Sequence, residues 1–441
     1  MNRLHSTSAA NVAIPDHRAL RFLTAGSVDD GKSTLIGRLL YDSRAILADQ
    51  IDTLEKRAAS LAPVEGGPGF DLSLLTDGLE AEREQGITID VAFRYFATPK
   101  RKFIIADAPG HEQYTRNMVT AAAGSDAAVV LVDITKLDTW SSPVKLLAQT
   151  RRHALLAALL RVPSIVFAVN KLDAVDHPQH AYGAVREALL TFAVDAGIEV
   201  AGVVPVSALR GDNVTTPLNV SWYSGMTLLQ LLESLPAAQE RRSGPLLLPV
   251  QYVAREGEGT GNQPRTLWGR IAHGSVQAGD AIALLPSGQR ATVAEVRLAG
   301  EVVDQVFAGQ SAGVVLDRHL DVSRGDWIAT PDTVREANRF SATLAWLDTE
   351  PAVVGRKYWV RHGNRWTHAR IIEIESVLDI HTLEATDAHQ LAANDIGTVV
   401  METQQALPVE AYETNRVGGA LIIVDPVSHR TSGALLVKAL A

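Results

Sequence analysis

The chain has 441 residues, of which 46% are hydrophobic and 21% charged, which is ordinary for a globular protein of about three domains and excludes disordered and collagen-like classes. Its 41 Lys and Arg against 50 Asp and Glu give a net charge of −9, which argues against a broad nucleic-acid coat. The absence of cysteine excludes disulfides, thiolate zinc sites, iron–sulfur clusters and cysteine nucleophiles.

The N-terminal residues 1–18 show no periodicity, and we expect them to form a loose arm. They contain no apolar core of a signal peptide. The longest apolar run, His153 to Val169, is interrupted by Arg161 and Pro163, so we interpret it as a buried helix followed by a strand and not as a membrane span. We therefore expect a cytoplasmic protein with no membrane segment.

From Arg21 to about Leu235, short apolar runs alternate with helix-length segments, which predicts a mixed, mostly parallel α/β sheet covered on both faces. One long helix is predicted to start at Pro143, because Ser141 and Ser142 supply hydroxyl caps before it. The predicted strands are 22–25, 91–96, 103–106, 127–132, 164–169 and 200–206, and the predicted helices include 112–123, 143–160 and 182–196.

The stretch between the first two strands has a different pattern. Apolar residues from Leu47 to Leu61 recur at helical spacing, Gly66 to Gly69 form a glycine-rich break, and a polar helix is predicted from Leu72 to Gln85. This glycine-rich break indicates a mobile switch segment, and the alternative is an ordinary surface loop.

After Leu235 the pattern becomes one of short alternating strands separated by glycine turns, which is typical of β-barrels or sandwiches. A linker is predicted over Ala237 to Pro249, and a boundary near Thr330. We therefore expect four parts, namely an arm (1–18), an α/β domain (19–240) and two β-barrels (245–331 and 335–441). The predicted strands include 248–254, 266–272, 281–285, 291–298, 358–361 and 366–374.

A phosphate-binding loop of the form G-x-x-x-x-G-K-[ST] follows the first strand and precedes a helical segment, which is the context that such a loop requires. Its glycines let the backbone wrap phosphates, its lysine supplies a charge, and its serine hydroxyl can ligate Mg²⁺. The alternative is a glycine turn that precedes Lys-Ser by chance. The predicted phosphate-binding residues are Gly26, Ser27, Val28, Asp29, Asp30, Gly31, Lys32, Ser33 and Thr34.

Asn170-Lys171-Leu172-Asp173 follows another predicted strand and indicates guanine recognition. The Asp173 carboxylate would accept hydrogen bonds from the ring N–H and the 2-amino group of guanine, whereas adenine presents a ring acceptor there. Alone, the tetrapeptide is a weak signal that is more typical of a helix-capping Asn and a solvated Asp, and it is the phosphate loop upstream that favours guanine recognition. Ser207-Ala208-Leu209 follows a later strand, where its backbone would contact the base oxygen.

Asp107-Ala108-Pro109-Gly110-His111 follows the strand 103–106. Asp107 at a strand end can hold Mg²⁺ through water, the Gly110 amide can bind a γ-phosphate, and His111 is placed to orient the attacking water. Thr88 is a candidate second Mg²⁺ ligand while the γ-phosphate orders its segment. The alternatives are a surface histidine and a β-branched strand residue.

These five motifs, in this order, resemble the translational class of GTPases, which carry a GTPase domain and two β-barrels, and the likeness covers nearly the whole chain. Within that class, the stretch from Gly26 to Asp42 resembles the GTPase (large) subunit of bacterial sulfate adenylyltransferase, since elongation factors usually carry His or Ser at the position of Asp30. The residues from Lys136 to Val144 differ from that family's pattern. Further stretches that resemble it are 82–92, 107–118, 205–213 and 414–416.

The resemblance implies GTP hydrolysis, with Mg²⁺, coupled to the formation of adenylyl sulfate from ATP and sulfate. The adenylyl transfer would reside in a smaller catalytic partner subunit, with neither nucleic acid nor membrane as partner. Some relatives carry a fused adenylyl-sulfate kinase. We expect that activity to be absent here, because no second phosphate loop occurs before Ala441.

Two other functions remain open. An elongation-factor-like GTPase that delivers aminoacyl-tRNA would use the cations and aromatic residues between Arg356 and Arg370, although on a hairpin this pattern favours one buried barrel face and one solvated face. A GTP-binding scaffold without turnover would not need His111.

Overall fold

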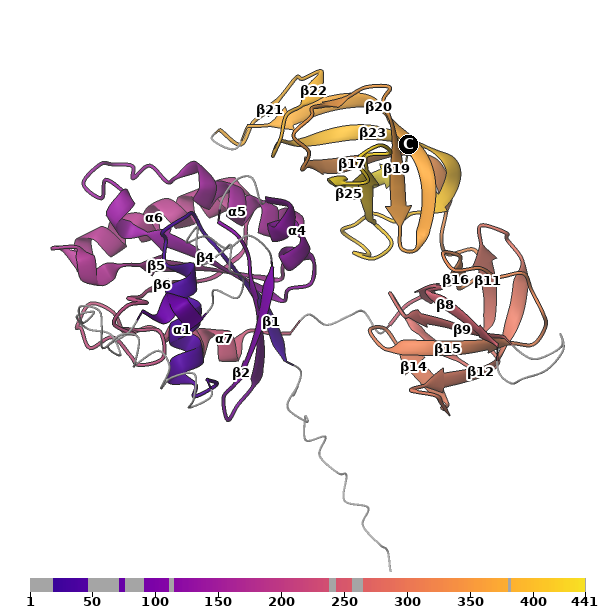
Figure 1. Cartoon of the computed structure of the whole chain (residues 1–441), viewed down its shortest axis with the longest axis horizontal. Coiled ribbons are helices and arrows are strands. Elements are labelled where there is room, and N and C mark those ends of the chain that lie inside the picture. Colours follow the sequence, from indigo (N-terminus) through magenta and orange to yellow (C-terminus); the bar gives the residue numbers. More distant parts are fainter. Residues whose placement is uncertain are drawn as a thin grey trace, which may run out of the picture. The chain divides into compact units, whose positions relative to one another are not determined.

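The structure is a computed structural model of the whole chain (Figure 1), and it describes residues 19–46, 71–75, 91–110, 115–237, 243–255, 265–379 and 382–440. These residues fall into two compact units, which we treat separately. The first holds one six-stranded sheet with its helices, and the second holds the strands that follow residue 243.

The sheet of the first unit has the strand order β2-β3-β1-β4-β5-β6, and every neighbouring pair is parallel except β2 with β3. The neighbouring strands β4 and β5 are buried along their whole length, as expected where helices cover both faces of a parallel sheet. The strands are β1 (Leu20–Ala25), β2 (Ala92–Ala97), β3 (Lys102–Asp107), β4 (Ala127–Asp133), β5 (Ser164–Asn170) and β6 (Val200–Pro205).

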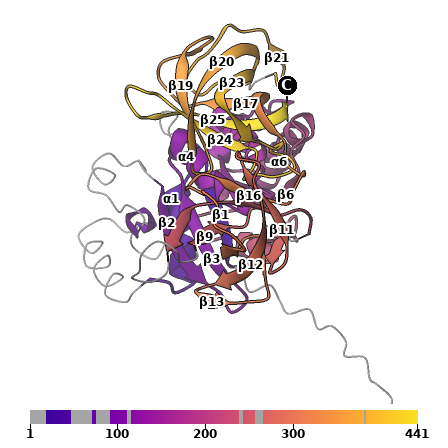
Figure 2. The same ribbon diagram turned by 90° about the vertical axis from the view of Figure 1, so that its right-hand side faces the viewer.

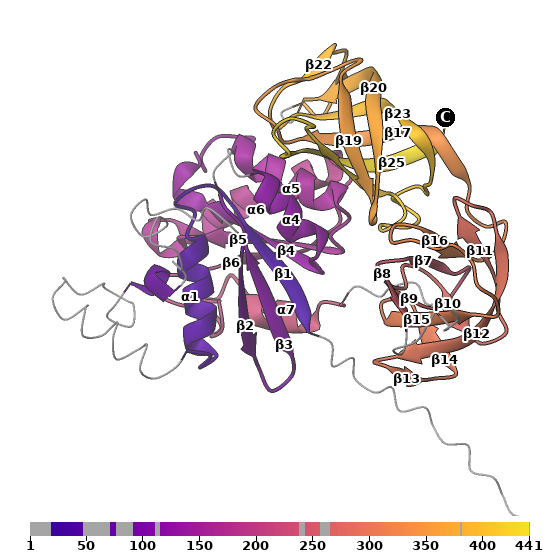
Figure 3. The ribbon, with the colours of Figure 1, turned by 45° about the vertical axis from the view of Figure 1, so that its right-hand side comes forward.

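Helices cover both faces of this sheet. α1 and α7 pack on one face, where Leu35, Leu39 and Leu232 join the core with Phe22 and Val166. Figure 3 shows α4, α5 and α6 together on the other face. The helices are α1 (Lys32–Asp42), α4 (Thr115–Ala123), α5 (Ala148–Leu159), α6 (Pro178–Asp195) and α7 (Leu228–Ser234), with the short 3-10 helices η1 (Leu72–Leu75), η3 (Ile134–Lys136) and η4 (Leu172–Ala174).

The carboxyl ends of the parallel strands lie at one edge of the sheet. Thr24 of β1 is in register with Asp107 of β3, and Asp133 of β4 is in register with Asn170 of β5. Ligands bind at this edge in open α/β sheets, so the fold gathers the loops that carry the predicted motifs.

The second unit contains two β-structures, each with its own core. In the first, the strand order is β7-β16-β11-β12-β15-β9-β8, around a core that includes Leu248, Val296 and Ile328. The strands are β7 (Leu247–Pro249), β8 (Tyr252–Arg255), β9 (Arg265–Arg270), β10 (Ser275–Gln277), β11 (Ala281–Leu285), β12 (Arg290–Leu298), β13 (Glu301–Val302), β14 (Gln305–Phe307), β15 (Ser311–Leu316) and β16 (Trp327–Ala329).

The later strands form a closed six-stranded barrel, because β19 pairs with both β24 and β20 in the order β19-β24-β25-β17-β23-β20 (Figure 2). The predicted fold class is confirmed as a mixed, mostly parallel α/β domain followed by two β domains, of which the second is a closed barrel. The strands are β17 (Glu336–Trp346), β18 (Ala352–Val353), β19 (Lys357–His362), β20 (Arg365–Leu378), β21 (Ala385–Thr386), β22 (Gln390–Leu391), β23 (Ile396–Pro408), β24 (Ala420–Val424) and β25 (Thr431–Leu440).

The predicted helix start at Pro143 is wrong. The Ser141 hydroxyl donates to the carbonyl of Asp138 (2.8 Å) and is used in a turn instead of capping a helix. Val144 and Leu146 are both buried, two residues apart, as in an extended segment, and α5 begins only at Ala148.

Two smaller predictions also need correction. The predicted strand 248–254 is two strands, β7 and β8. β7 begins inside the predicted linker 237–249, because Leu247 and Leu248 are buried and pair with β16. The predicted helix from Leu72 to Gln85 is a 3-10 helix over its described part, Leu72–Leu75.

No helix within the described ranges is long and apolar enough to cross a membrane.

Candidate functional site

The predicted phosphate loop connects β1 to α1 at the carboxyl edge of the sheet. Gly31 is the N-cap of α1 with φ +91°, a backbone conformation that favours glycine, and a Cβ at Gly31 would collide with the Asn170 amide. Lys32, Ser33 and Thr34 form the first turn of the helix, whose free N–H groups suit an anion. Val28 is half-buried and Asp29 is exposed.

The side chain of Lys32 curls back over the loop. Its ammonium donates to the carbonyl oxygens of Gly26 (2.9 Å) and Ser27 (2.7 Å), and the residue is only 7% exposed. Burial lowers the pKa of Lys32, although Asp30 and Asp107 oppose the shift. A buried cation beside free N–H groups is well placed to receive phosphate oxygens.

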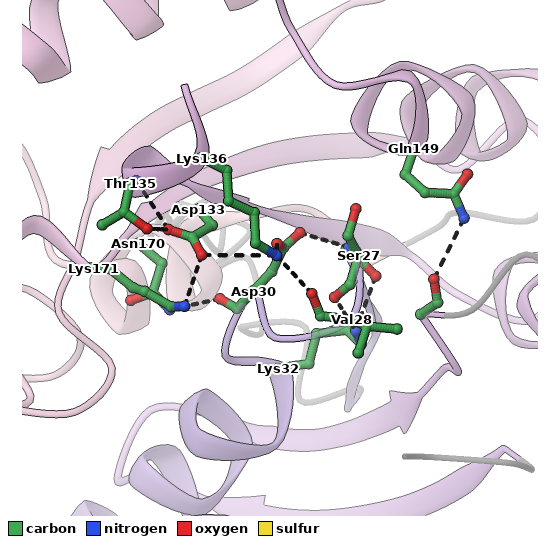
Figure 4. Close-up of polar contacts among 12 residues, drawn as sticks. Ser27, Val28, Asp30, Lys32, Asp133, Thr135, Lys136, Gln149, Asn170 and Lys171 are labelled. Atoms are coloured by element: carbon green, nitrogen blue, oxygen red, sulfur yellow. Dashed lines mark hydrogen bonds and ion pairs between the residues drawn. The ribbon is translucent and has the colours of Figure 1, made fainter. Parts of the chain in front are cut away.

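Asp30 lies under the loop with no exposed surface. Its carboxylate accepts the backbone N–H of Ser27 (2.6 Å) and the ammonium of Lys136 (2.9 Å), and Lys136 also donates to the carbonyl of Val28 (2.7 Å; Figure 4). We call Asp30 and Lys136 the loop ion pair. It ties the phosphate loop to η3, which directly follows β4.

The predicted Asp107–Gly110 motif lies against the phosphate loop. Asp107 ends β3, is 2% exposed, and accepts a hydrogen bond from the Thr24 hydroxyl (3.3 Å). A Cβ at Gly110 would lie 2.6 Å from the Gly26 carbonyl oxygen, closer than real Cβ atoms come, so only glycine fits there. Gln149 of α5 donates to the Gly110 carbonyl (3.4 Å). Ala108 and Pro109 are buried.

Asn170 joins three of the predicted motifs. Its side-chain amide donates to the Asp30 carbonyl in the phosphate loop (2.8 Å), and its side-chain oxygen accepts the backbone N–H of Ala208 (2.9 Å). The Leu172 N–H donates to the Val206 carbonyl (3.3 Å), which is a second bond between the segment at Asn170 and the segment at Ser207. The structure therefore brings the loops at Asn170 and Ser207 to the phosphate loop.

Lys171 and Asp173 extend from the same turn. Lys171 has φ +63°, and its ammonium lies 2.7 Å from an Asp133 carboxylate oxygen. Asp173 has a largely buried side chain (13% exposed), 3.9 Å from the guanidinium of Arg210. Ser207 is buried and Leu209 is 38% exposed. A buried carboxylate at the open end of this loop fits the predicted contact with the edge of guanine.

Several predictions concern residues outside the described ranges. They include the catalytic candidate His111, the Mg²⁺ candidate Thr88, the helix 47–61 and the break at Gly66 to Gly69. These stay predictions.

Sequence reasoning missed residues from α5 and from the end of β4. Asp133 ends β4 at the same edge as Asp107 and Asn170. Its place at the end of a buried apolar run was the signal that could have identified Asp133, and also Lys136 three residues later, as residues of the site. His153 of α5 is 3% exposed, and its Nδ1 has no partner among the described residues. Burial lowers the pKa of His153 to about 3, and the cations Lys32 and Arg152 add to the effect.

The basic and aromatic stretch that could suggest RNA binding forms the hairpin of β19 and β20. Tyr358, Val360 and His362 are buried in the barrel, whereas Trp359 and Arg361 alternate with them on the outer face. This confirms the predicted division into a buried and a solvated face, which accounts for the pattern without RNA.

The family described as "Elongation factor Tu GTP binding domain" matches residues 17–238, and "GTP-eEF1A C-terminal domain-like" matches residues 339–438. Sulfate adenylyltransferase subunit 1 of Laribacter hongkongensis is 41% identical over 95% of this chain and 85% of that protein. The chain belongs to the sulfate adenylyltransferase subunit 1 family.

Two further relatives show the same likeness. Sulfate adenylyltransferase subunit 1 of Colwellia psychrerythraea is 42% identical over 95% of this chain and 87% of that protein. The bifunctional enzyme NodQ of Azospirillum brasilense is 43% identical over 95% of this chain but only 66% of its own length. Membership of the sulfate adenylyltransferase subunit 1 family agrees with the match to a GTP-binding domain. The words "subunit 1" in the names of these relatives imply at least one other subunit in those enzymes.

Proposed function

We propose that this chain is the GTP-hydrolysing subunit of a sulfate adenylyltransferase, which drives the formation of adenylyl sulfate and pyrophosphate from ATP and sulfate. The adenylyl transfer itself would take place on a smaller catalytic partner subunit. The domains would be the GTPase domain at 19–240 and two β-barrels at 245–331 and 335–441, with an arm at 1–18.

The observation that carries this proposal is that the loops at Gly110, Asn170 and Ala208 gather around the phosphate loop. The Gly110 backbone abuts the Gly26 carbonyl, and the Asn170 side chain links the phosphate loop to the loop at Ala208. Lys32 itself is buried, and its hydrogen bonds within the described residues go to two neutral carbonyls, which leaves its positive charge available to a phosphate group. A guanosine triphosphate fits these donors, with its phosphates on the loop and its base at Asp173.

The same residues fit a magnesium ion beside the phosphates. The Ser33 hydroxyl stands in the first turn of α1, and Asp107 ends the neighbouring strand β3. Hydroxyl and carboxylate oxygens are the ligands that Mg²⁺ prefers, and Ser33, Thr88 and, through water, Asp107 would hold it. When bound, the ion would neutralise charge that develops on the phosphates.

His111 would orient the attacking water, because it directly follows Gly110. Gly110, packed against Lys32 and the Gly26 carbonyl, would present its amide to the γ-phosphate. Loss of that phosphate would remove the contact, which is how hydrolysis would be transmitted to the rest of the chain.

The coupling to sulfate activation has a physical reason. Formation of a phosphosulfate anhydride with displacement of pyrophosphate is uphill, so a second nucleotide must supply free energy. A GTPase can do so only if it contacts its partner differently in its two nucleotide states.

The test is to purify the chain and measure GTP hydrolysis with and without the partner subunit, ATP and sulfate. We expect the partner with both substrates to raise GTP turnover, and GTP to raise the yield of adenylyl sulfate. GTP turnover indifferent to all three would contradict the coupling, whereas a salt-dependent affinity for aminoacyl-tRNA would favour the delivery function.

A further inference from the structure

Arg38 of α1 is a buried cation that the proposed mechanism does not use. It is 7% exposed, and its guanidinium donates to the carbonyl oxygens of Ala208 (3.3 Å) and Leu209. Both acceptors belong to the loop that would contact the base, 170 residues further along the chain. A guanidinium fork on two consecutive carbonyls orients two successive peptide planes at once.

The backbone N–H groups of that loop show what this orientation achieves. Within the part of the chain that the structure describes, every N–H from Ser207 to Gly211 has an acceptor except that of Leu209. The acceptors are the Asp212 carbonyl for Ser207 (3.0 Å), the Asn170 side chain for Ala208 (2.9 Å), the Ser207 hydroxyl for Arg210 (3.1 Å) and the Ser207 carbonyl for Gly211 (2.7 Å).

The direction of the Leu209 N–H follows from the geometry of the peptide bond. In a trans peptide, the carbonyl of one residue and the N–H of the next point in opposite directions. Arg38 holds the Ala208 carbonyl on the side of α1, so the Leu209 N–H must point away from α1. Since the Ala208 N–H is already bonded to Asn170, the Leu209 N–H is the donor left for a base.

We infer that Arg38 is a specificity-determining residue, which positions the Leu209 N–H to donate to the 6-oxygen of guanine. This inference rests on the guanine site of the proposed function. It divides base recognition between Asp173, which reads the ring N–H and the 2-amino group, and Arg38, which acts through Leu209 on the 6-position.

Neighbouring residues hold Arg38 in place. Its guanidinium lies 3.6 Å from the Asp42 carboxylate, which also accepts the Thr215 hydroxyl (2.6 Å). A Cβ at Gly211, whose φ is +86°, would lie 3.3 Å from Arg38 Cδ. The side chain is therefore enclosed on the side of the loop as well as paired within its helix, and it has little freedom to leave the two carbonyls.

The experiment measures the Kd of the full-length chain for three diphosphates by competition with a fluorescent GDP analogue. GDP carries both recognised groups, IDP lacks the 2-amino group, and 6-thio-GDP has a larger and weaker acceptor at the 6-position. The variants are Arg38→Met, which keeps the stem without the donors, and Arg38→Lys, which keeps the charge without the fork. Arg44→Met, an exposed cation just beyond α1, is the matched control.

We expect Arg38→Met to weaken GDP and IDP binding equally, by about fivefold, which corresponds to one hydrogen bond. Binding of 6-thio-GDP should change less than twofold, so the ratio of its Kd to that of GDP falls while the IDP ratio stays constant. Arg38→Lys should be intermediate, and Arg44→Met should match the wild type.

If Arg38→Met weakens the binding of all three nucleotides equally, the ratio of the Kd for 6-thio-GDP to that for GDP stays unchanged. Arg38 would then act only on the fold, and the inference would be overturned. If Arg38→Met does not fold, as judged by its melting curve, Arg38→Lys decides on the same criteria. A wild-type chain that binds GDP no better than IDP or ADP would instead refute the guanine site itself.

Discussion

The loop ion pair of Asp30 and Lys136 allows the strongest quantitative prediction. Replacing Lys136 by Met leaves the Asp30 carboxylate, which has no exposed surface, without its cation beneath the loop that would receive the phosphates. Removal of one partner of a buried pair typically costs about 3–5 kcal/mol. Here Lys136 is 33% exposed, and the Ser27 N–H still donates to Asp30, so we expect a smaller cost of about 2 kcal/mol. Because the unpaired Asp30 charge would also repel the phosphates, GDP affinity should fall by at most the same energy, which is about 30-fold.

A double-mutant cycle separates this charge effect from a general loss of structure. In the double variant Asp30→Asn/Lys136→Met, no buried charge remains, and the Asn side-chain oxygen can still accept the Ser27 N–H. We expect it to bind GDP more tightly than Lys136→Met alone. Lys145→Met, an exposed cation in the same connection between β4 and α5, is the control.

The assay is isothermal titration calorimetry with GDP on Lys136→Met, Asp30→Asn, the double variant, Lys145→Met and the wild type, with melting curves to confirm folding. The reasoning fails if Lys136→Met binds GDP within twofold of the wild type. It also fails if the two single substitutions add without coupling in the double variant.

Four further predictions follow from the site. Asp173→Asn should shift binding by about 10- to 100-fold from GTP toward xanthosine triphosphate, because the amide can donate to the 2-oxo group of that base. The control Asp176→Asn, at a neighbouring exposed position, should leave selectivity unchanged. Unchanged selectivity in Asp173→Asn itself would exclude Asp173 from base recognition. His111→Ala should bind GTP normally in calorimetry but hydrolyse it about 100-fold more slowly, whereas full turnover would support a scaffold. Burial lowers the pKa of His153 to about 3, so between pH 6.5 and pH 3 the unfolded chain binds a proton at this residue that the folded chain does not. The free energy of unfolding should therefore decrease as the pH is lowered below 6.5, by about 2 kcal/mol at pH 5. His153→Leu should abolish this part of the acid sensitivity, as measured by urea titrations. Deletion of Pro63–Phe70 should uncouple GTP turnover from adenylyl-sulfate yield, and unchanged values of both would exclude a switching role for that stretch.

The motif residues were predictable because each lies within a few residues of a strand that its own apolar pattern reveals. Asp107 and Asn170 end buried runs, and parallel strands place such ends at one edge. The chain order of the motifs then predicted a guanine nucleotide.

The side chains that hold those motifs together could not be found in this way. Lys136 meets Asp30 across 106 residues and Arg38 meets Ala208 across 170, and no local periodicity encodes such pairs. The error at Pro143 has a local origin instead, since a hydroxyl before proline suits a helix cap, but here the Asp138 carbonyl, three residues earlier, takes the Ser141 hydroxyl.

The position of β25 within its barrel bears on how the protein is made in the cell. This strand, Thr431–Leu440, lies between β17 and β24 and bonds to both, although it is the last of the six barrel strands in chain order. The barrel therefore cannot close on the ribosome before Leu440 has emerged, whereas all six strands of the nucleotide-binding sheet are complete by Pro205. Ribosome-bound intermediates should accordingly acquire GDP binding well before the C-terminal barrel resists protease.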